Sequence, residues 1–588
     1  MRIDDQQREV VESQSKNILC IAGPGSGKTR TLVERVAYLI EQRKVSSHEL
    51  VLFTFTRNAA QEMRKRIEAR IGISAHKVQI GTFHSIALNL LHRFGDLIGY
   101  KADHITVYGS FEEEYLLREC AIDLGIYRRK SWMPPKKKVS KVLNDYYFRG
   151  EEPGEDNPCR IIFNEFIARC KENQSLTFGG LLVGFKLLLP HITKYLNWKH
   201  VMIDEAHDNN LIQWDLVLEI QRRCNASLFV VSDLDQAIYH FRGAFPQWIL
   251  ENQDQFDIYR IENNYRSTPQ IVAASNRLIE HNKERIEKTM VATREDGDNL
   301  AKITEADSTR LADFIHYITE KDTPSGSIVV LSRIHALLEK LSQGLNEKGI
   351  PNKKIGRKTQ LVNSEEFRRF HAFLKLIINP FDNFSFLLIR DIIGVTKTGY
   401  GLLRLHAAKT GKSHFQAFME LSGLPDWREF FRKASHYDME GLMYKMSRMN
   451  FGCDMSHVIE FIDSWCADNS GIKDTACDEG PLLKYLSWLA MWDMQDEVGE
   501  EEENCIKLMT SHSSKGLEFP VVIIAGANEG IMPSKQSIKS GDIEEERRIF
   551  YVACTRAKDT LIITSRPETE ENPQSRFIKE LGDCPAFE

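Results

Sequence analysis

The sequence has no long hydrophobic run, no closely spaced cysteines and no excess of positive charge. No apolar stretch in its 588 residues approaches the ~20 residues that a membrane-spanning helix needs, so we expect no membrane partner. The eleven cysteines are scattered, which offers neither a zinc knuckle nor a compact disulfide framework. The chain starts with a polar segment that is not typical of a signal or transit peptide, and we therefore expect a cytoplasmic location.

The charge balance gives no general case for nucleic-acid binding. Lysine and arginine number 77 against 83 acids, and the net charge is −6. Any nucleic-acid surface must therefore be local. One acid-free stretch carries seven cations around Trp132, namely Arg128, Arg129, Lys130, Lys136, Lys137, Lys138 and Lys141. It could hold a phosphate backbone, or it could be a solvated loop broken by Pro134 and Pro135, and both readings stay open.

The most informative segment present is a glycine-rich loop between a predicted strand and a predicted helix. Its residues are Ala22, Gly23, Pro24, Gly25, Ser26, Gly27, Lys28 and Thr29. This order of elements is typical of the phosphate-binding P-loop, whose backbone N–H groups surround phosphates. Lys28 is expected to reach the β- and γ-phosphates, and the Thr29 hydroxyl to bind Mg²⁺. Ala22 stands where the commonest form of the motif has glycine. The loop predicts ATP and Mg²⁺ as cofactors.

Two adjacent carboxylates follow another buried apolar run. Asp204 and Glu205 come directly after the predicted strand 200–203, at the strand end where α/β sheets bind ligands. With a P-loop upstream, Asp204 is expected to hold Mg²⁺ through water. Glu205 is expected to polarise the water that attacks the γ-phosphate. Without the P-loop, the pair would be interpreted as an acidic helix cap.

Buried β-type runs alternate with helical patterns in two blocks, which predicts an α/β fold with two parallel sheets flanked by helices. The expected strands of the first block are 18–21, 50–53, 78–82, 200–203 and 228–232. Those of the second are 327–331, 506–509, 520–524 and 560–564. A mainly helical insertion interrupts each block. The predicted limits are 1–90 with 183–275, insertion 91–182, then 276–385 with 504–588, and the short insertion 386–503, which ends in the acidic run 500–503.

Further motifs occur in a fixed order along nearly the whole chain. They are the segments 4–8, 52–60, 81–85, 230–244, 262–267, 508–520 and 544–558. With the P-loop and the carboxylate pair, they resemble the motifs of superfamily 1 helicases of the UvrD/Rep/PcrA type. The resemblance implies two RecA-like P-loop NTPase domains, 1A and 2A, and assigns the insertions as subdomains 1B and 2B.

The resemblance also implies roles at the nucleotide. Gln7 would bind the adenine edge, Tyr265 would stack on its face, and Glu518 would hold the ribose. Gln236 and Arg266 would contact the γ-phosphate. Arg556 would be an arginine finger supplied across the interdomain cleft. The expected catalytic set consists of Gln236, Arg266 and Arg556 with Lys28, Asp204 and Glu205, while Gln7, Tyr265 and Glu518 are expected to bind the nucleotide only.

For the DNA track, the resemblance points to stacking of bases on Phe55, Tyr239 and Phe241. Contacts to the DNA backbone would come from His84, Arg242 and His512. The sequence departs from the family pattern in three places. His207 replaces the usual glutamine, Arg57 replaces the usual asparagine, and the segment 177–181 lacks the family's two carboxylates.

The resemblance implies an ATP-dependent translocase that moves on single-stranded DNA and unwinds forked duplex from 3′ to 5′. One alternative is a DNA-dependent ATPase that clears proteins or signals without separating strands. The other is a helicase subunit that works with a separate nuclease or repair partner, as in phage defence. The stretch after Arg556 is expected to be too short for a nuclease domain of its own. RNA is a less favoured substrate, since nothing in the chain is specific for a 2′-hydroxyl.

Overall fold

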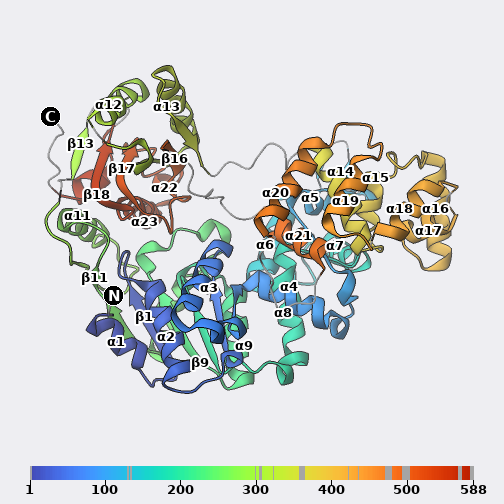
Figure 1. Ribbon diagram of the computed structural model, residues 1–588, viewed down its shortest axis with the longest axis horizontal. Coiled ribbons are helices and arrows are strands. Elements are labelled where there is room, and N and C mark those ends of the chain that lie inside the picture. The colour runs from blue at the N-terminus through green and yellow to red at the C-terminus, as the bar shows by residue number, and fades with distance from the viewer. Residues whose placement is uncertain are drawn as a thin grey trace.

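A computed structural model of the chain describes residues 3–128, 131–132, 135–297, 300–303, 307–321, 323–355, 364–421, 423–434, 436–469, 480–492, 504–566 and 573–582. It contains two six-stranded sheets covered by helices and two mainly helical blocks (Figure 1). Of the sequence-based assignments, Arg129, Lys130 and the acidic run 500–503 fall outside the described residues.

The first sheet is fully parallel, in the order β10-β1-β9-β8-β2-β3. Its strands are β1 Asn17–Ala22, β2 Leu50–Thr54, β3 Gln79–Thr82, β8 His200–Ile203, β9 Ser227–Ser232 and β10 Asp257–Ile261. Alternate residues of a strand point to opposite faces, so Ile18 and Cys20 enter one apolar cluster while Leu19 and Ile21 enter another. Burial on both faces explains why these strands read as continuous apolar runs.

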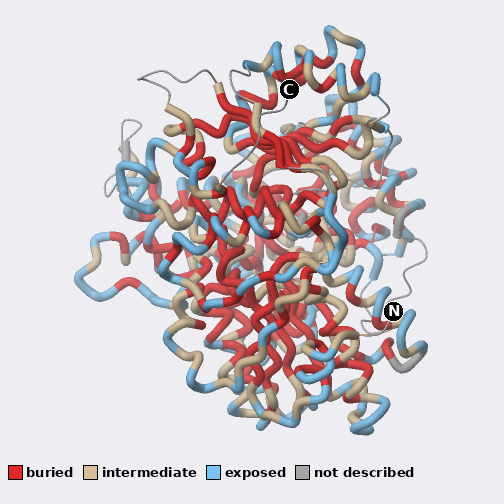
Figure 2. Tube along the Cα trace, turned by 90° about the vertical axis from the view of Figure 1, so that its left-hand side faces the viewer, coloured by how far each residue is buried: buried red, intermediate tan, exposed pale blue. Residues whose placement is uncertain are grey.

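Helices cover both faces of this sheet. The first cluster packs the sheet against α1 Asp5–Glu12, α2 Lys28–Glu41 and α3 Arg57–Ile71. The second packs it against α4 Phe83–Phe94, α8 Phe178–Ile192 and α9 Leu211–Cys224. Figure 2 shows the buried residues concentrated along the sheets, with exposed residues on the outer helices.

The second sheet is also fully parallel, in the order β13-β18-β17-β14-β16-β15. Its strands are β13 Ala301–Ile303, β14 Ile328–Ser332, β15 Asn352–Lys354, β16 Ile506–Thr510, β17 Phe519–Ala525 and β18 Ala557–Thr564. One face packs on α11 Pro269–Ile279, α23 Ile543–Cys554 and α24 Arg576–Glu580, and the other on α12 Ser308–Glu320 and α13 His335–Glu347. The predicted α/β fold class and every predicted strand are confirmed.

The first helical block shares its apolar core with the first sheet. It consists of α5 Ser110–Asp123, α6 Lys136–Arg149 and α7 Arg160–Glu172, with α4 and α8 beside them. The segment 177–181, which lacks the two carboxylates of the family pattern, caps α8 and packs closely on α6. The Thr177 side chain accepts a hydrogen bond from the Gly180 N–H at 3.0 Å and so caps α8. A Cβ at Gly179 would lie 2.3 Å from the Tyr147 ring, so the glycine permits close packing on α6.

The second helical block has a core of its own. Its helices are α14 Glu365–Ile378, α15 Asn383–Ile389, α16 Lys397–Thr410, α17 His414–Leu421, α18 Pro425–Ala434, α19 Met439–Ser447, α20 Ser456–Asn469 and α21 Pro481–Trp492. This core begins earlier than residue 386, because Phe367, Phe370 and Phe373 of α14 belong to it. The domain limits drawn from the sequence otherwise stay a prediction.

In space, the second helical block lies beside the first one and not over the second sheet that it interrupts (Figure 1). The Tyr108 hydroxyl donates to Asp382 at 2.6 Å, and the Asn379 amide donates to Thr106 at 2.9 Å, both in buried surroundings. Arg57, the departure noted in segment 52–60, donates to the Trp488 carbonyl at 2.9 Å. These contacts join the second helical block to the residues just before α5 and to α3, across 273 to 431 positions of the chain.

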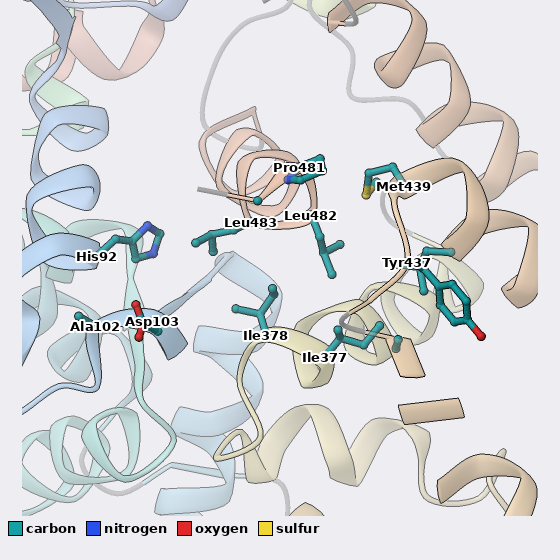
Figure 3. A pocket seen from close by; sticks show the side chains of 13 residues that line it. His92, Ala102, Asp103, Ile377, Ile378, Tyr437, Met439, Pro481, Leu482 and Leu483 are labelled. Carbon is teal, nitrogen blue, oxygen red and sulfur yellow. The ribbon is translucent and has the colours of Figure 1, made fainter. Parts of the chain in front are cut away.

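A cavity of about 320 Å³ lies between the two helical blocks (Figure 3). His92, Ala102 and Asp103 line it on one side, and residues such as Ile378 and Leu482 line it on the other. None of the site residues predicted from the sequence takes part. Within the described ranges, no helix is both long and apolar enough to span a membrane.

Candidate active site between the two sheets

The P-loop has the geometry expected for phosphate binding. Gly25 and Gly27 adopt positive φ values of 70° and 83°, which side chains rarely tolerate. No side chain caps the start of α2 at Gly27, so its first N–H groups face the loop, as in helix-terminal phosphate sites. The motif 262–267 packs directly on the loop. Asn264 donates to the Pro24 carbonyl at 2.8 Å, and the Tyr265 N–H donates to the Gly25 carbonyl at 2.9 Å.

Asp204 and Glu205 lie opposite this loop at the end of β8. The Lys28 ammonium is 3.2 Å from Glu205 Oε2, so the two residues expected around the γ-phosphate are already neighbours. Glu205 has a φ of 49°, an uncommon backbone conformation for a glutamate. Such local strain is typical of residues whose side chains must point into a site.

The electrostatics at β8 fit a divalent cation. Burial, followed by the neighbouring Glu205 charge, raises the pKa of Asp204 to about 7. Burial also raises the pKa of Asp208 to about 6. A cation between such carboxylates and a nucleotide would favour their ionised forms. Among the described residues, no group of three or more His, Cys, Asp or Glu could hold a metal on its own. Mg²⁺ here would therefore draw most ligands from phosphates and water, with Thr29, the second residue of α2, and Asp204 beside it.

Arg556 reaches the first sheet from the second. It follows α23, is 2 % exposed, and donates from Nη2 to Gln236 Oε1 at 3.1 Å. Its Nε donates to the Val552 carbonyl at 2.9 Å, which fixes the side chain on its own helix. Burial, then the nearby Arg266 charge, lowers the pKa of Arg556 to about 9. The predicted γ-phosphate residue and the predicted arginine finger are thus in direct contact across the cleft.

Four other predicted nucleotide residues contact protein groups in this structure. Arg266 pairs through Nε with Glu518 at 2.8 Å, so the expected phosphate and ribose ligands bind each other. The Gln7 amide donates to the Ser26 carbonyl at 2.9 Å. The Tyr265 hydroxyl donates to Asp4, and the residue as a whole is 46 % exposed. A bound nucleotide would have to replace the Gln7 and Arg266 contacts, whereas the Tyr265 ring face is already accessible for stacking.

A second link between the sheets was not predicted from the sequence. Lys515 lies in the segment 508–520 and donates to Asp208 at 2.6 Å and to the Gln236 carbonyl at 2.8 Å. Its Nζ is also 3.0 Å from His207 Nε2. Burial and the Lys515 charge lower the pKa of His207 well below its usual value. His207, which stands where the family usually has glutamine, is therefore a neutral imidazole. Both motifs were recognised, but a pairing across 307 positions has no local sequence signal.

Four of the predicted DNA contacts gather on one surface. Phe55 stacks on Tyr239 with ring centroids 5.0 Å apart, and Phe241 meets His512 edge-on at 5.5 Å. Phe241 is 64 % exposed and available for stacking, whereas Tyr239 is buried. A cavity of about 450 Å³ opens beside Phe241 and His512. The cavity is also lined by polar residues that the sequence did not single out, among them Arg333, His335, Ser534 and Ser537.

The remaining predicted DNA residues, Arg242 and His84, differ in character. The Arg242 guanidinium lies 5.1 Å from the Tyr239 ring centre and joins the aromatic surface. His84 stacks on Phe178 at 3.8 Å, and burial lowers its pKa to about 3. The pKa of His512 is likewise lowered to about 3 by burial and neighbouring cations. Both histidines are therefore neutral and could offer a phosphate an N–H donor but no charge. The roles of all these residues at DNA stay a prediction.

Comparison with known proteins agrees with this architecture. Residues 3–257 match the model of the UvrD/REP helicase N-terminal domain, and residues 259–413 and 428–568 match the UvrD-like helicase C-terminal domain. The ATP-dependent DNA helicase PcrA of Bacillus subtilis (strain 168) is 29 % identical over 643 residues, covering 98 % of this chain and 85 % of the relative. The protein of the same name from Staphylococcus aureus (strain COL) is 27 % identical over 655 residues, covering 99 % and 86 %.

Proposed function

Because the chain belongs to the UvrD/REP helicase family, we propose that it is an ATP-dependent DNA helicase that moves on single-stranded DNA. The observation that carries the proposal is the contact between Arg556 of the second sheet and Gln236 of the first, beside Lys28 and Glu205. A hydrolysis site assembled from two sheets can couple ATP turnover to their relative movement.

In the proposed mechanism, the P-loop N–H groups and Lys28 hold the phosphates, and Glu205 orients the attacking water. Arg266 and Arg556 stabilise the charge that develops on the transferred phosphoryl group. Mg²⁺ held near Thr29 and Asp204 would neutralise phosphate charge. For Arg266 to act in this way, it must exchange its ion pair with Glu518 for the nucleotide.

For the DNA track, we infer that the strand crosses the surface formed by Phe55, Tyr239, Phe241 and His512. Phe241 supplies an exposed ring for base stacking, and Arg242 supplies a cation beside it. The Tyr239 hydroxyl is 3.4 Å from the His512 carbonyl, so this surface contains contributions from both sheets. The contacts of this surface with a bound strand would therefore change as the cleft opens and closes. We propose a 3′ to 5′ direction, forked DNA as substrate and a cytoplasmic location, following the family resemblance.

The test is strand displacement with duplexes that carry either a 3′ or a 5′ single-stranded tail. We expect ATP-dependent displacement of the 3′-tailed duplex, and none by Lys28→Ala, which lacks the phosphate-binding ammonium. Displacement of the 5′-tailed duplex alone would contradict the direction. ATP hydrolysis stimulated by single-stranded DNA without displacement would favour a translocase that does not separate strands. Absence of DNA-stimulated hydrolysis would overturn the proposal.

A further inference from the structure

A buried cluster of four charges lies next to Gln236, and the proposed mechanism does not use it. The Lys288 ammonium donates to Asp233 Oδ1 at 2.6 Å and also contacts Asp235. Arg285 binds Asp235 through two hydrogen bonds of 3.0 and 2.8 Å. The Lys288 side chain is only 2 % exposed, and both carboxylates are buried. Burying four charged groups is costly unless they are well paired and hydrogen-bonded, as these four are.

The two cations come from the segment 280–290, which follows α11 and connects the two sheets. At one end, this segment is attached to α23 of the second sheet, because Arg547 donates to Asn282 at 2.5 Å and Arg548 to the Glu284 carbonyl at 2.8 Å. At the other end, Met290 packs against the P-loop, where its sulfur would lie 2.0 Å from a Cβ added at Gly23. Lys288 therefore lies in a segment that contacts the helix leading to Arg556 and the loop expected to bind phosphate.

The hydrogen bonds of Asp233 determine which way the Gln236 amide points. An ionised carboxylate can only accept hydrogen bonds. Asp233 Oδ2 accepts from Gln236 Nε2 at 2.6 Å. This contact turns the amide oxygen toward Arg556, whose Nη2 lies 3.1 Å away. With the opposite orientation, the amide NH₂ would face a guanidinium that can only donate, and this contact would be lost.

The charge on Lys288 maintains this arrangement. Burial would raise the pKa of Asp233, but Lys288, followed by Lys28, outweighs burial and lowers it. Loss of Lys288 would shift the buried carboxyl toward its neutral form, which carries an O–H donor and no longer restricts the amide. Since Asp233 is fully buried, solvent cannot replace the missing cation.

We propose that Lys288 is a positioning residue for ATP hydrolysis: acting through Asp233, it fixes the Gln236 amide with its oxygen toward Arg556. This inference rests on the proposed function. It assigns a role to Lys288 and Asp233 in addition to holding the fold. It also gives the segment 280–290 a means of transmitting the position of α23 to the groups around the γ-phosphate.

The test compares steady-state ATP hydrolysis, stimulated by single-stranded DNA, in the wild type and in Lys288→Met, which has similar length and no charge. We expect kcat to fall on the order of 10²-fold, with little change in the ATP KM, as for a misplaced catalytic group. Asp233→Asn should cause a similar loss, and Lys288→Arg, which keeps the charge, should recover part of the rate. In a Gln236→Ala background, Lys288→Met should cause little further loss, because the group that it positions is absent.

A matched control separates this role from stability. Lys375→Met removes another buried lysine, 10 % exposed, from its 2.5 Å ion pair with Glu112 in the helical blocks. It should lower the thermal unfolding temperature but leave kcat unchanged. A kcat loss in Lys288→Met that adds fully to that of Gln236→Ala would overturn the inference, as would an unchanged kcat. If the wild type itself lacks DNA-stimulated hydrolysis, it is the proposed function that fails.

Discussion

At the scale of single residues, the cleft gives two neighbouring carboxylates different surroundings. Asp204 is 7 % exposed and has no cationic partner among the described ion pairs, whereas Glu205 lies 3.2 Å from Lys28. The first environment suits a group that binds a cation, and the second suits a group that orients water near the γ-phosphate.

This difference predicts separable effects of substitution. Glu205→Gln should keep ATP and DNA affinity but lose hydrolysis, because an amide cannot polarise the attacking water as a carboxylate does. Lys28→Ala should weaken nucleotide binding itself. Binding of a fluorescent ATP analogue, measured beside steady-state hydrolysis, checks both variants. An equal loss of nucleotide affinity in the two variants would contradict the division of roles.

Residue identities were predictable where chemistry follows a local motif, as for Lys28 and the carboxylate pair. The partners of these residues were not predictable. Arg266 binds Glu518 and Lys515 binds Asp208 across 252 and 307 positions, and only the folded chain brings them together. The positioning role inferred for Lys288 also had no sequence signal, since a lone lysine between motifs is usually a solvated surface residue.

At the scale of elements, every central strand of the two large sheets was predictable, whereas of their four edge strands only β3 was. β1 and β14 are buried on both faces and read as apolar runs. The missed strands of these sheets, β10, β13 and β15, all lie at edges, and β10 and β15 have the sequences DIYRI and NKK with partly exposed side chains. An edge strand pairs on one side only, so its sequence carries a weaker hydrophobic signal.

The second half of the basic stretch 128–141 is not a loop, because α6 begins at Lys136 immediately after Pro135. Lys136 pairs with Glu114, while Lys137, Lys138 and Lys141 are exposed. Cations in the first turn of a helix are opposed by the helix dipole, so their presence is not explained by helix stability.

We therefore predict that this helix contacts the duplex ahead of the fork. Replacing Lys137, Lys138 and Lys141 by Ala should make the slope of log affinity for duplex against log salt concentration less negative by roughly two to three. Each lost phosphate contact contributes about 0.9 to this slope. Unwinding should fall more than hydrolysis stimulated by single strands. Lys136→Ala, which removes an ion-paired lysine, serves as the control. An unchanged slope would assign the stretch to a solvated helix face.

At the scale of the whole molecule, two covered parallel sheets were predictable from the alternation of apolar runs and helical patterns, but the packing of the two helical blocks against each other was not. The second helical block lies against the first, through contacts such as Tyr108 with Asp382, although the chain inserts it into the second sheet. Because one helical core is continuous with the first sheet and the other is joined to it by buried hydrogen bonds, we expect both blocks to move with the first sheet.

The central claim is that hydrolysis requires a residue supplied across the cleft. The most direct measurement is DNA-stimulated ATP hydrolysis by Arg556→Ala, beside its affinity for single-stranded DNA without nucleotide. We predict that kcat falls at least ~10³-fold, as for loss of an arginine finger. The reason is that Arg556 belongs to the second sheet's domain and reaches Gln236 across the cleft. DNA affinity without nucleotide should barely change, since Arg556 is buried and its side chain is hydrogen-bonded to protein groups. A loss of DNA affinity as large as the loss of rate would contradict the account and identify Arg556 as a DNA contact.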